Sequence, residues 1–163
     1  MTGYLHRFPR FADLPAQDVA IVERVLVVQA FPKDHVFVRE GDRATATTAE
    51  MHLVIEGEIE VTAARPEGGF AIRRTLSAGE IFGHVALVAD VVRTATCRAS
   101  TPAVTARMDR RVFDELYRHD EGVHARFQLV VARQLASDAR ALHELLVQSI
   151  ATGDDSPLRH RFG

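Results

Sequence analysis

The sequence predicts a mainly β domain with some α-helix: an antiparallel β-roll or jelly-roll-like barrel, preceded by a short N-terminal helix and followed by a long C-terminal helix. Three observations predict this class. Short apolar segments between residues 31 and 109 are separated by glycine-containing turns, which is typical of antiparallel strands. Apolar residues near the start of the chain recur at helical spacing. From Gly122 to Ile150 the chain has no proline and no further glycine, which favours helix.

The first helix is expected to begin at Pro15, because proline suits the first position of a helix. The apolar residues that follow lie at helical spacing; they are Val19, Val22, Val25 and Leu26. The pattern changes at Phe31, where the segment HVFVREGD alternates apolar and polar residues and ends on Gly41.

The central part of the chain is predicted to be a series of short strands. From Met51 to Val61 every odd-numbered position is apolar or glycine, and His52 and three glutamates lie on even-numbered positions, which predicts one half-buried strand bent at Gly57. Two further strands, FAIRRTL and RTATCRAS, are set off by the turns PEGG and SAGE.

The C-terminal part is predicted to form a helix over RRVFDELYRH and a second helix over residues 122–150. The second would be roughly 40 Å long, more than a small barrel covers, and this favours a homodimer formed through it. The residues at heptad-like spacing that would form the seam are Val131, Leu135, Leu142 and Leu145. Alternatively, the same residues pack on the barrel of their own chain. We therefore expect one domain over residues 1–150 and a flexible tail over residues 151–163.

Composition argues against several function classes. The formal net charge is −2, and the basic residues, all but one of them arginine, form no cluster, so no direct binding to nucleic acid is expected. Cys97 is the single cysteine, which argues against a disulfide or a thiolate zinc site and fits a reducing cytoplasm. No apolar stretch is long enough to predict a membrane span. Because no nucleophile motif or P-loop is present, we do not expect an enzyme.

One segment has the features of an anion-binding site. In IFGHVALVADVVRTATCRA, Gly83 precedes a short apolar stretch that begins with Val85 and Ala86, and Arg93 follows with Thr94 beside it. Backbone N–H groups at the start of a short helix point toward a bound anion, and a guanidinium binds phosphate oxygens through paired donors. A glycine and an arginine alone are more often a turn and a solvated side chain.

The order of the motifs resembles the cyclic nucleotide-binding domain, a family shared by catabolite activator protein-like regulators, cyclic nucleotide-dependent kinases and gated channels. The resemblance covers residues 11–150. RFADLPAQDVAIV is similar to the opening helix, FVREGD to a strand with its turn, MHLVIEGEIEV to the central strand, and LSAGEIFGHVALV with VRTAT to the phosphate-binding cassette.

The resemblance implies a role for each residue of the cassette. Gly83 and the amides after it, from His84 to Ala86, would cradle a cyclic phosphate, Arg93 would neutralise it, and Thr94 would add a hydroxyl contact. His84 stands where the family usually has a glutamate that accepts from the ribose 2′-hydroxyl. Losing that bond weakens binding roughly 10- to 100-fold unless a neutral imidazole accepts instead.

The resemblance also assigns the helix over residues 122–150 as the lid and dimer helix of the family. It places Asp138 near the purine, where the carboxylate would accept from an exocyclic amine. An equal alternative makes Asp138 a polar residue that sets the register of the helix seam.

The sequence therefore predicts a cytoplasmic regulatory sensor that binds a small phosphate-bearing ligand, with cyclic AMP or cyclic GMP as candidates, and signals to a protein effector. The given sequence ends at Gly163, which leaves no residues for the DNA-binding domain that follows in many relatives, so a transcription factor would require either a longer chain or a separate partner for the output. One alternative is a dimerisation scaffold that has lost nucleotide binding, which His84 favours. A weaker alternative is a haem sensor with His84 and Cys97 as axial ligands. No metal site is expected, since the sequence has no His-x-His or His-x-x-x-His pair. His119 and His124 are predicted to be surface residues near a helix junction.

Overall fold

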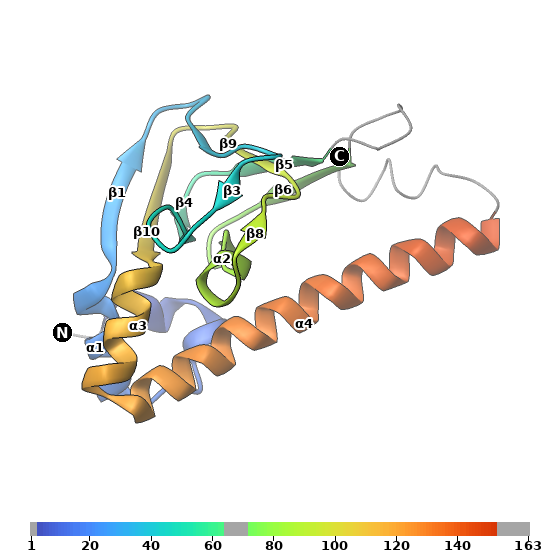
Figure 1. Cartoon of the computed structure of the whole chain (residues 1–163). Helices are drawn as coiled ribbons and strands as arrows, with labels where there is room; N and C mark the ends of the chain where they lie inside the picture. Colours follow the sequence, from blue (N-terminus) through green and yellow to red (C-terminus); the bar gives the residue numbers. More distant parts are fainter. Residues whose placement is uncertain (1–2, 64–71, 153–163) are drawn as a thin grey trace.

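The computed structural model describes residues 3–63 and 72–152, which fold as a β-roll flanked by helices (Figure 1). The antiparallel strands of the described residues form two four-stranded sheets, ordered β1-β10-β4-β7 and β2-β9-β5-β6, and a small β3-β8 pair. The predicted β-roll is confirmed. The two larger sheets share no strand in the described part of the chain, so they are not closed into a barrel. The predicted turn at residues 66–69 and most of the predicted tail lie outside the described residues.

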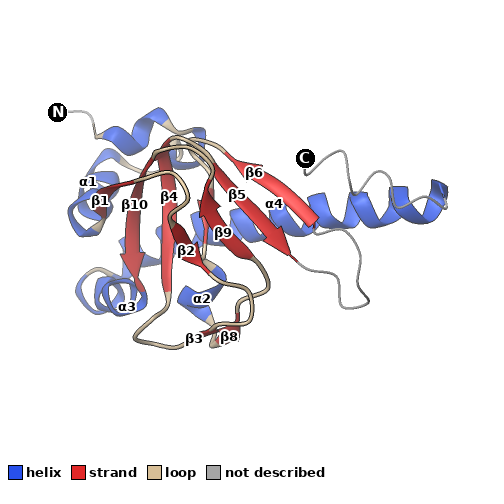
Figure 2. Cartoon of the chain, turned by 90° about the horizontal axis from the view of Figure 1, so that it is seen from above, coloured by secondary structure: helices blue, strands red, loops and turns tan. Residues whose placement is uncertain are grey.

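The strands are short, as the turn spacing predicted. In chain order they are β1 (Val27–Phe31), β2 (Val36–Val38), β3 (Arg43–Ala44), β4 (Glu50–Glu56), β5 (Ile59–Ala63), β6 (Ile72–Leu76), β7 (Ile81–Phe82), β8 (Val91–Val92), β9 (Thr96–Ala99) and β10 (Ala103–Asp109). Figure 2 shows the two larger sheets side by side, with the β3-β8 pair next to the short helix α2 (Val85–Val88).

The predicted strand from Met51 to Val61 is two strands in different sheets. Gly57 lies between them with φ +84°, and a Cβ there would come within 2.3 Å of the Pro102 carbonyl oxygen. Only glycine allows both the positive φ and this close approach of the backbone. At this point the chain crosses from one sheet to the other. The expectation of a half-buried strand is wrong for β4, since residues 51–55 are all buried. One of its faces packs on the helices and the other faces the second sheet.

The helices cover the outer face of the first sheet. Two short 3₁₀ helices, η1 (Tyr4–Arg7) and η2 (Pro9–Phe11), lead into α1 (Ala16–Val25). The helix begins at Ala16, one residue later than predicted, and Pro15 is the residue just before it. Val19 and Val22 are buried in the main core with apolar residues of β4 and β10.

Two helices end the described chain, α3 (Arg110–His119) and α4 (Glu121–Thr152), close to the predicted bounds. The first half of α4 packs into the core through Val123, Phe127 and Val130. Its second half runs beyond the sheets (Figure 1). Among the described residues, none of the helices combines the length and the apolar character needed to cross a bilayer.

Candidate ligand-binding site

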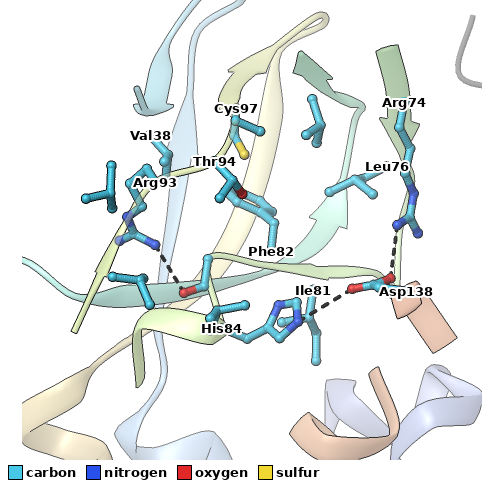
Figure 3. Close-up of a pocket in the computed structure, with 16 residues that line it drawn as sticks. Val38, Arg74, Leu76, Ile81, Phe82, His84, Arg93, Thr94, Cys97 and Asp138 are labelled. Carbon is cyan, nitrogen blue, oxygen red and sulfur yellow. Dashed lines mark hydrogen bonds and ion pairs between the residues drawn. The ribbon is translucent and has the colours of Figure 1, made fainter. Parts of the chain in front are cut away.

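A cavity of about 320 Å³ lies between the second sheet, the segment from β7 to β9, and α4 (Figure 3). Its walls are largely apolar, from residues such as Val38, Val61, Leu76 and Phe82, and its polar groups come from both ends. Of the seven ligand-binding residues predicted from the sequence, six line this cavity: Gly83, His84, Val85, Arg93, Thr94 and Asp138. The cavity therefore brings together residues that lie up to 55 positions apart.

The turn at Gly83 shapes the lower edge of the cavity. Gly83 has φ +74°, and a Cβ there would come within 2.5 Å of the Glu50 carbonyl oxygen. The chain then enters α2. Ala86, the remaining predicted ligand residue, does not line the cavity. It is fully buried against Ala44 and Ala49, and its amide donates to the Gly83 carbonyl at 3.2 Å. The predicted cradle is therefore limited to the residues before it.

Arg93 stands beside this turn. Its backbone is held by the Glu-Gly-Asp turn, because its amide donates to the Asp42 carbonyl at 2.8 Å and its own carbonyl accepts from Gly41 at 2.9 Å. Its guanidinium donates to the Gly83 carbonyl at 3.3 Å (Figure 3). Burial lowers the pKa of Arg93 and nearby acidic groups oppose this shift, but a guanidinium remains charged at neutral pH. The site thus holds a positive charge next to a glycine turn.

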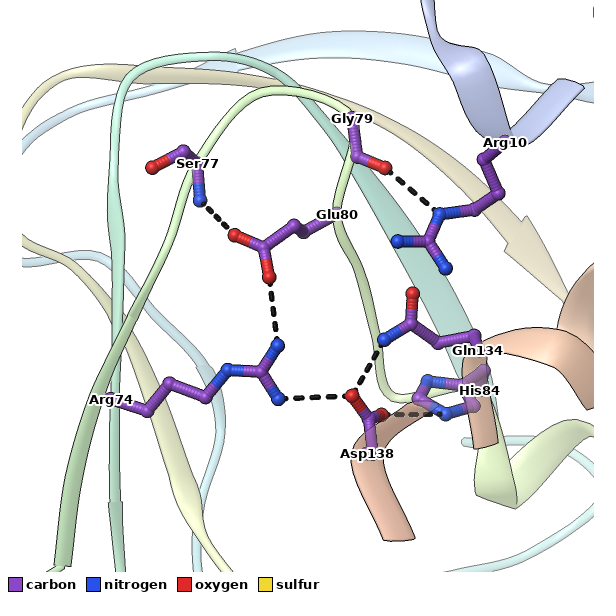
Figure 4. Close-up of polar contacts among 8 residues, drawn as sticks. All are labelled: Arg10, Arg74, Ser77, Gly79, Glu80, His84, Gln134 and Asp138. Atoms are coloured by element: carbon purple, nitrogen blue, oxygen red, sulfur yellow. Dashed lines mark hydrogen bonds and ion pairs between the residues drawn. The ribbon is translucent and has the colours of Figure 1, made fainter. Parts of the chain in front are cut away.

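The other end of the cavity holds a network of charged and polar side chains (Figure 4). Arg74 donates to Asp138 at 3.0 Å and to Glu80 at 2.7 Å. Gln134, one helical turn before Asp138, donates to the same carboxylate at 2.6 Å. Burial disfavours the charge of Arg74, but these bonds outweigh it and raise the pKa. Asp138 therefore ties α4 to β6 at the cavity.

His84 lies on the floor of the cavity and is 5% exposed. Its Nε2 is 3.5 Å from Asp138 Oδ2 (Figure 4). Burial lowers the pKa of His84, and the charges of Arg10 and Arg74 add to this effect while Asp138 opposes it. The imidazole is therefore neutral at pH 7.

Sequence reasoning missed Arg74, Gln134 and Arg10. Arg74 shares strand parity with the buried Leu76, and this parity is a signal that its side chain faces inward. Gln134 is one turn from Asp138 on the same helix face. Arg10 donates to the Gly79 carbonyl at 3.2 Å across 69 residues, and no local pattern indicates that contact.

The predicted dimer residues lie in different environments. Val131 is buried in the core of its own chain and Leu135 packs partly against that core, as the alternative reading of the seam expected. Leu142 is 49% exposed. The side chain of Leu145 lies outside the described part of α4. Only Leu142 is therefore shown at the surface, and the homodimer remains a prediction.

The remaining candidates for chemistry are Cys97, His119 and His124. Cys97 lines the cavity, and burial raises the pKa of its thiol to about 11. His119 is exposed as expected, but the expectation for His124 is wrong. His124 is buried against Phe113, with ring centroids 4.5 Å apart, because α3 folds back on α4. Within residues 3–63 and 72–152, no group of three or more His, Cys, Asp or Glu side chains is placed to hold a metal ion.

Comparison with known proteins identifies the family. The family model of the cyclic nucleotide-binding domain matches residues 28–120, more than half of the chain. The cAMP-dependent protein kinase regulatory subunit of Yarrowia lipolytica is 32% identical over 114 residues, which are 70% of this chain and 28% of that protein. The chain spans less than a third of the length of each of the curated relatives it matches.

Solved structures show the same fold. A cyclic nucleotide-binding domain from Methylobacillus flagellatus has a TM-score of 0.77 at 21% identity, covering 90% of this chain and 80% of that one. The catabolite activator protein of Thermus thermophilus has a TM-score of 0.64 at 22% identity, covering 89% of this chain and 63% of that one. Given the family match, the shared fold and the glycine turn beside Arg93, this chain belongs to the cyclic nucleotide-binding domain family.

Proposed function

We propose that this chain is a regulatory sensor that binds a cyclic nucleotide next to Arg93 and passes the bound state to a protein partner through α4. The observation that carries the proposal is the position of the Arg93 guanidinium, 3.3 Å from the Gly83 carbonyl at the edge of a cavity of about 320 Å³. That volume is within the usual range for small-molecule sites. A positive charge at its edge favours an anionic ligand.

The two ends of the cavity suit the two ends of a nucleotide. At one end the cyclic phosphate would accept from Arg93 and from the Thr94 hydroxyl, since both residues line the cavity there. Between the two ends, the apolar walls would contact the base, and Asp138 would face it from the far end. The Yarrowia relative is named as a cAMP-dependent kinase subunit, which supports cyclic AMP as the first ligand to test.

The output of the sensor would pass through α4. Asp138 lines the cavity and also bonds Arg74 and Gln134, so a ligand that enters beside Asp138 changes the contacts that hold α4 to β6. The part of the helix beyond the sheets carries Leu142 and Val147, each 49% exposed. We infer that this part of α4 binds a second copy of the chain or a protein effector.

The experiment is a thermal shift assay with cyclic AMP and cyclic GMP on the full chain. A ligand present at 100 times its dissociation constant adds about 2.7 kcal/mol of stability, so the unfolding temperature is expected to rise with cyclic nucleotide and not with 5′-AMP. No rise with either cyclic nucleotide at millimolar concentration would contradict the proposal.

The second candidate is an interaction scaffold that has lost ligand binding. The observation that favours it is the ion pair of Arg74 with Asp138, which already satisfies the charges at the α4 end of the cavity. A chain that dimerises but gains no stability from any cyclic nucleotide would establish the scaffold in place of the sensor.

A further inference from the structure

A second pocket, of about 700 Å³, lies between α2, α3 and α4 and shares no lining residue with the ligand cavity. Its apolar surface comes from Leu87 and Val88 of α2 and from the rings of Phe113 and Tyr117 of α3. Val88 and Tyr117 are each about half exposed. The second pocket therefore presents apolar groups to solvent beside the helix that follows the glycine turn.

The imidazole of His124 lines this pocket and is 7% exposed. The ring packs against Phe113 and Tyr117, with ring centroids 4.5 and 5.2 Å apart. Within the described residues neither ring nitrogen makes a hydrogen bond, and unlike those of His84 they are not fully enclosed. Burial lowers the pKa of His124 and Asp114 opposes this shift, so the ring is neutral at pH 7 and has one donor and one acceptor. A group bound in the second pocket can reach them.

The second pocket also holds charges of both signs. Arg110 lines it, but its guanidinium is already bonded to Asp90. Arg118 near the end of α3 and Glu121 at the start of α4 line it too, and neither side chain makes a hydrogen bond or an ion pair with the described part of the chain. Asp114 lies one helical turn before Arg118 and forms no ion pair with it. A guanidinium and two carboxylates are thus available to a ligand.

These groups specify the chemistry of the ligand. A carboxylate suits Arg118, because a guanidinium binds carboxylates through paired donors. An ammonium suits Asp114 and Glu121, and an apolar side chain suits the surface of α2 and α3. An anion or a cation alone would leave charges of the opposite sign unsatisfied. A free amino acid with a large apolar side chain carries all three groups and is a zwitterion at pH 7.

We infer that the second pocket is a ligand site that binds a zwitterionic amino acid, with its apolar side chain against Tyr117 and His124. The site does not depend on the proposed function. One consequence does depend on it, because α2 separates the two cavities: Val85 lines the nucleotide cavity, while Leu87 and Val88 line the second pocket. If ligands at both sites act on α2, each changes the affinity for the other by the same factor.

The test is isothermal titration calorimetry of L-phenylalanine with the full chain. L-alanine lacks the ring and should bind roughly 10- to 100-fold more weakly, as expected when a phenyl group is no longer buried. Phenethylamine lacks the carboxylate and 3-phenylpropionate lacks the ammonium. Each should bind roughly 10-fold more weakly or worse, as expected for one lost charge-assisted hydrogen bond.

Two variants assign these contacts to residues. Arg118→Gln is expected to bind phenylalanine no better than phenethylamine, because the partner of the carboxylate is gone. Asp114→Asn/Glu121→Gln is expected to bind phenylalanine no better than 3-phenylpropionate. Arg111→Gln is the matched control, since Arg111 is exposed on α3 and does not line the second pocket; it should keep both preferences.

The wild-type protein gives a readout that needs no variant. In two-dimensional ¹⁵N NMR of the histidine rings, phenylalanine should move the resonances of His124 and leave those of the exposed His119 in place. Unmoved His124 resonances, or equal affinities for phenylalanine and its two single-charge analogues, would overturn the amino acid site and leave the nucleotide sensor intact.

The coupling has its own measurement. Saturating phenylalanine should change the affinity for cyclic AMP by roughly 5-fold or more. An unchanged affinity for cyclic AMP would overturn the coupling through α2 but not the site. If cyclic AMP does not bind at all, the sensor and the coupling fail together, and the binding of phenylalanine still decides the second site.

Discussion

Replacing Gly83 by alanine should destabilise the fold and abolish ligand binding. Gly83 has φ +74°, a conformation that costs an L-residue about 1–2 kcal/mol. The new Cβ would also lie 2.5 Å from the Glu50 carbonyl oxygen, so β4 or the turn must shift. Overpacking of this kind typically costs about 1–3 kcal/mol more. The total expected loss is therefore roughly 2–5 kcal/mol.

Gly41 provides a matched control that isolates the cost of the positive φ. It has φ +87°, but a Cβ built there meets nothing within 4 Å. Gly41→Ala is therefore expected to lose only the conformational part, about 1–2 kcal/mol, in urea unfolding followed by circular dichroism. Calorimetric titration with cyclic AMP should show binding by this variant and none by Gly83→Ala. Equal losses of stability in the two variants, with binding retained in both, would refute the role assigned to the close approach at Gly83.

Three other properties follow from the structure. Leu142→Asp is expected to convert a homodimer into a monomer in sedimentation equilibrium, and a wild-type chain that is monomeric at micromolar concentration would remove the dimer. Because burial raises the pKa of the Cys97 thiol to about 11, iodoacetamide should label the native protein much more slowly than the unfolded chain. Fast labelling of the native protein, or a haem absorbance band, would contradict a buried and unreactive Cys97. Burial lowers the pKa of His84 and of His124, so the unfolded chain binds protons first and the free energy of unfolding should fall as the pH drops below ~6.5. The fall should be smaller in His84→Gln/His124→Gln, and equal pH profiles would show that these imidazoles are not responsible.

The parts of the site that sequence predicts are those determined by short segments. Gly83 and Arg93 lie ten residues apart on either side of α2, and their contact through the Gly83 carbonyl follows from a turn and a short helix between them. The glycine pattern therefore located one end of the cavity. The prediction that Ala86 binds the ligand was wrong for a local reason as well. Its amide already donates to the Gly83 carbonyl in the first turn of α2.

The parts that sequence does not predict depend on packing between distant elements. A heptad pattern does not distinguish a partner helix from the core of the same chain, and Val131 belongs to that core. The alternation of apolar and polar residues predicted one half-buried strand. In the structure β4 is covered on both faces, because one face packs on the helices and the other on the second sheet. The pairing of Asp138 with Arg74 joins residues 64 positions apart, and nothing near either residue indicates it.

The same distant pairing changes how position 84 should be interpreted. From the sequence alone, His84 replaces the glutamate that is usual in the family and predicts weaker ligand binding. In the structure it faces Asp138 at 3.5 Å, so a carboxylate at position 84 would meet a second carboxylate in a buried environment. Such like-charge pairs are unfavourable. The charges of Arg10 and Arg74, which also reach position 84, would oppose that repulsion.

The central claim is that an anionic ligand binds at Arg93, and calorimetric titration of cyclic AMP into three proteins tests it most directly. The account predicts measurable binding by the wild type and by Arg98→Ala, which removes an arginine that pairs with Glu60 and Asp34 and does not line the cavity. Arg93→Ala should lose roughly 10- to 100-fold or more in affinity, as expected for charge-assisted hydrogen bonds. Binding by Arg93→Ala as tight as that of Arg98→Ala would contradict the account.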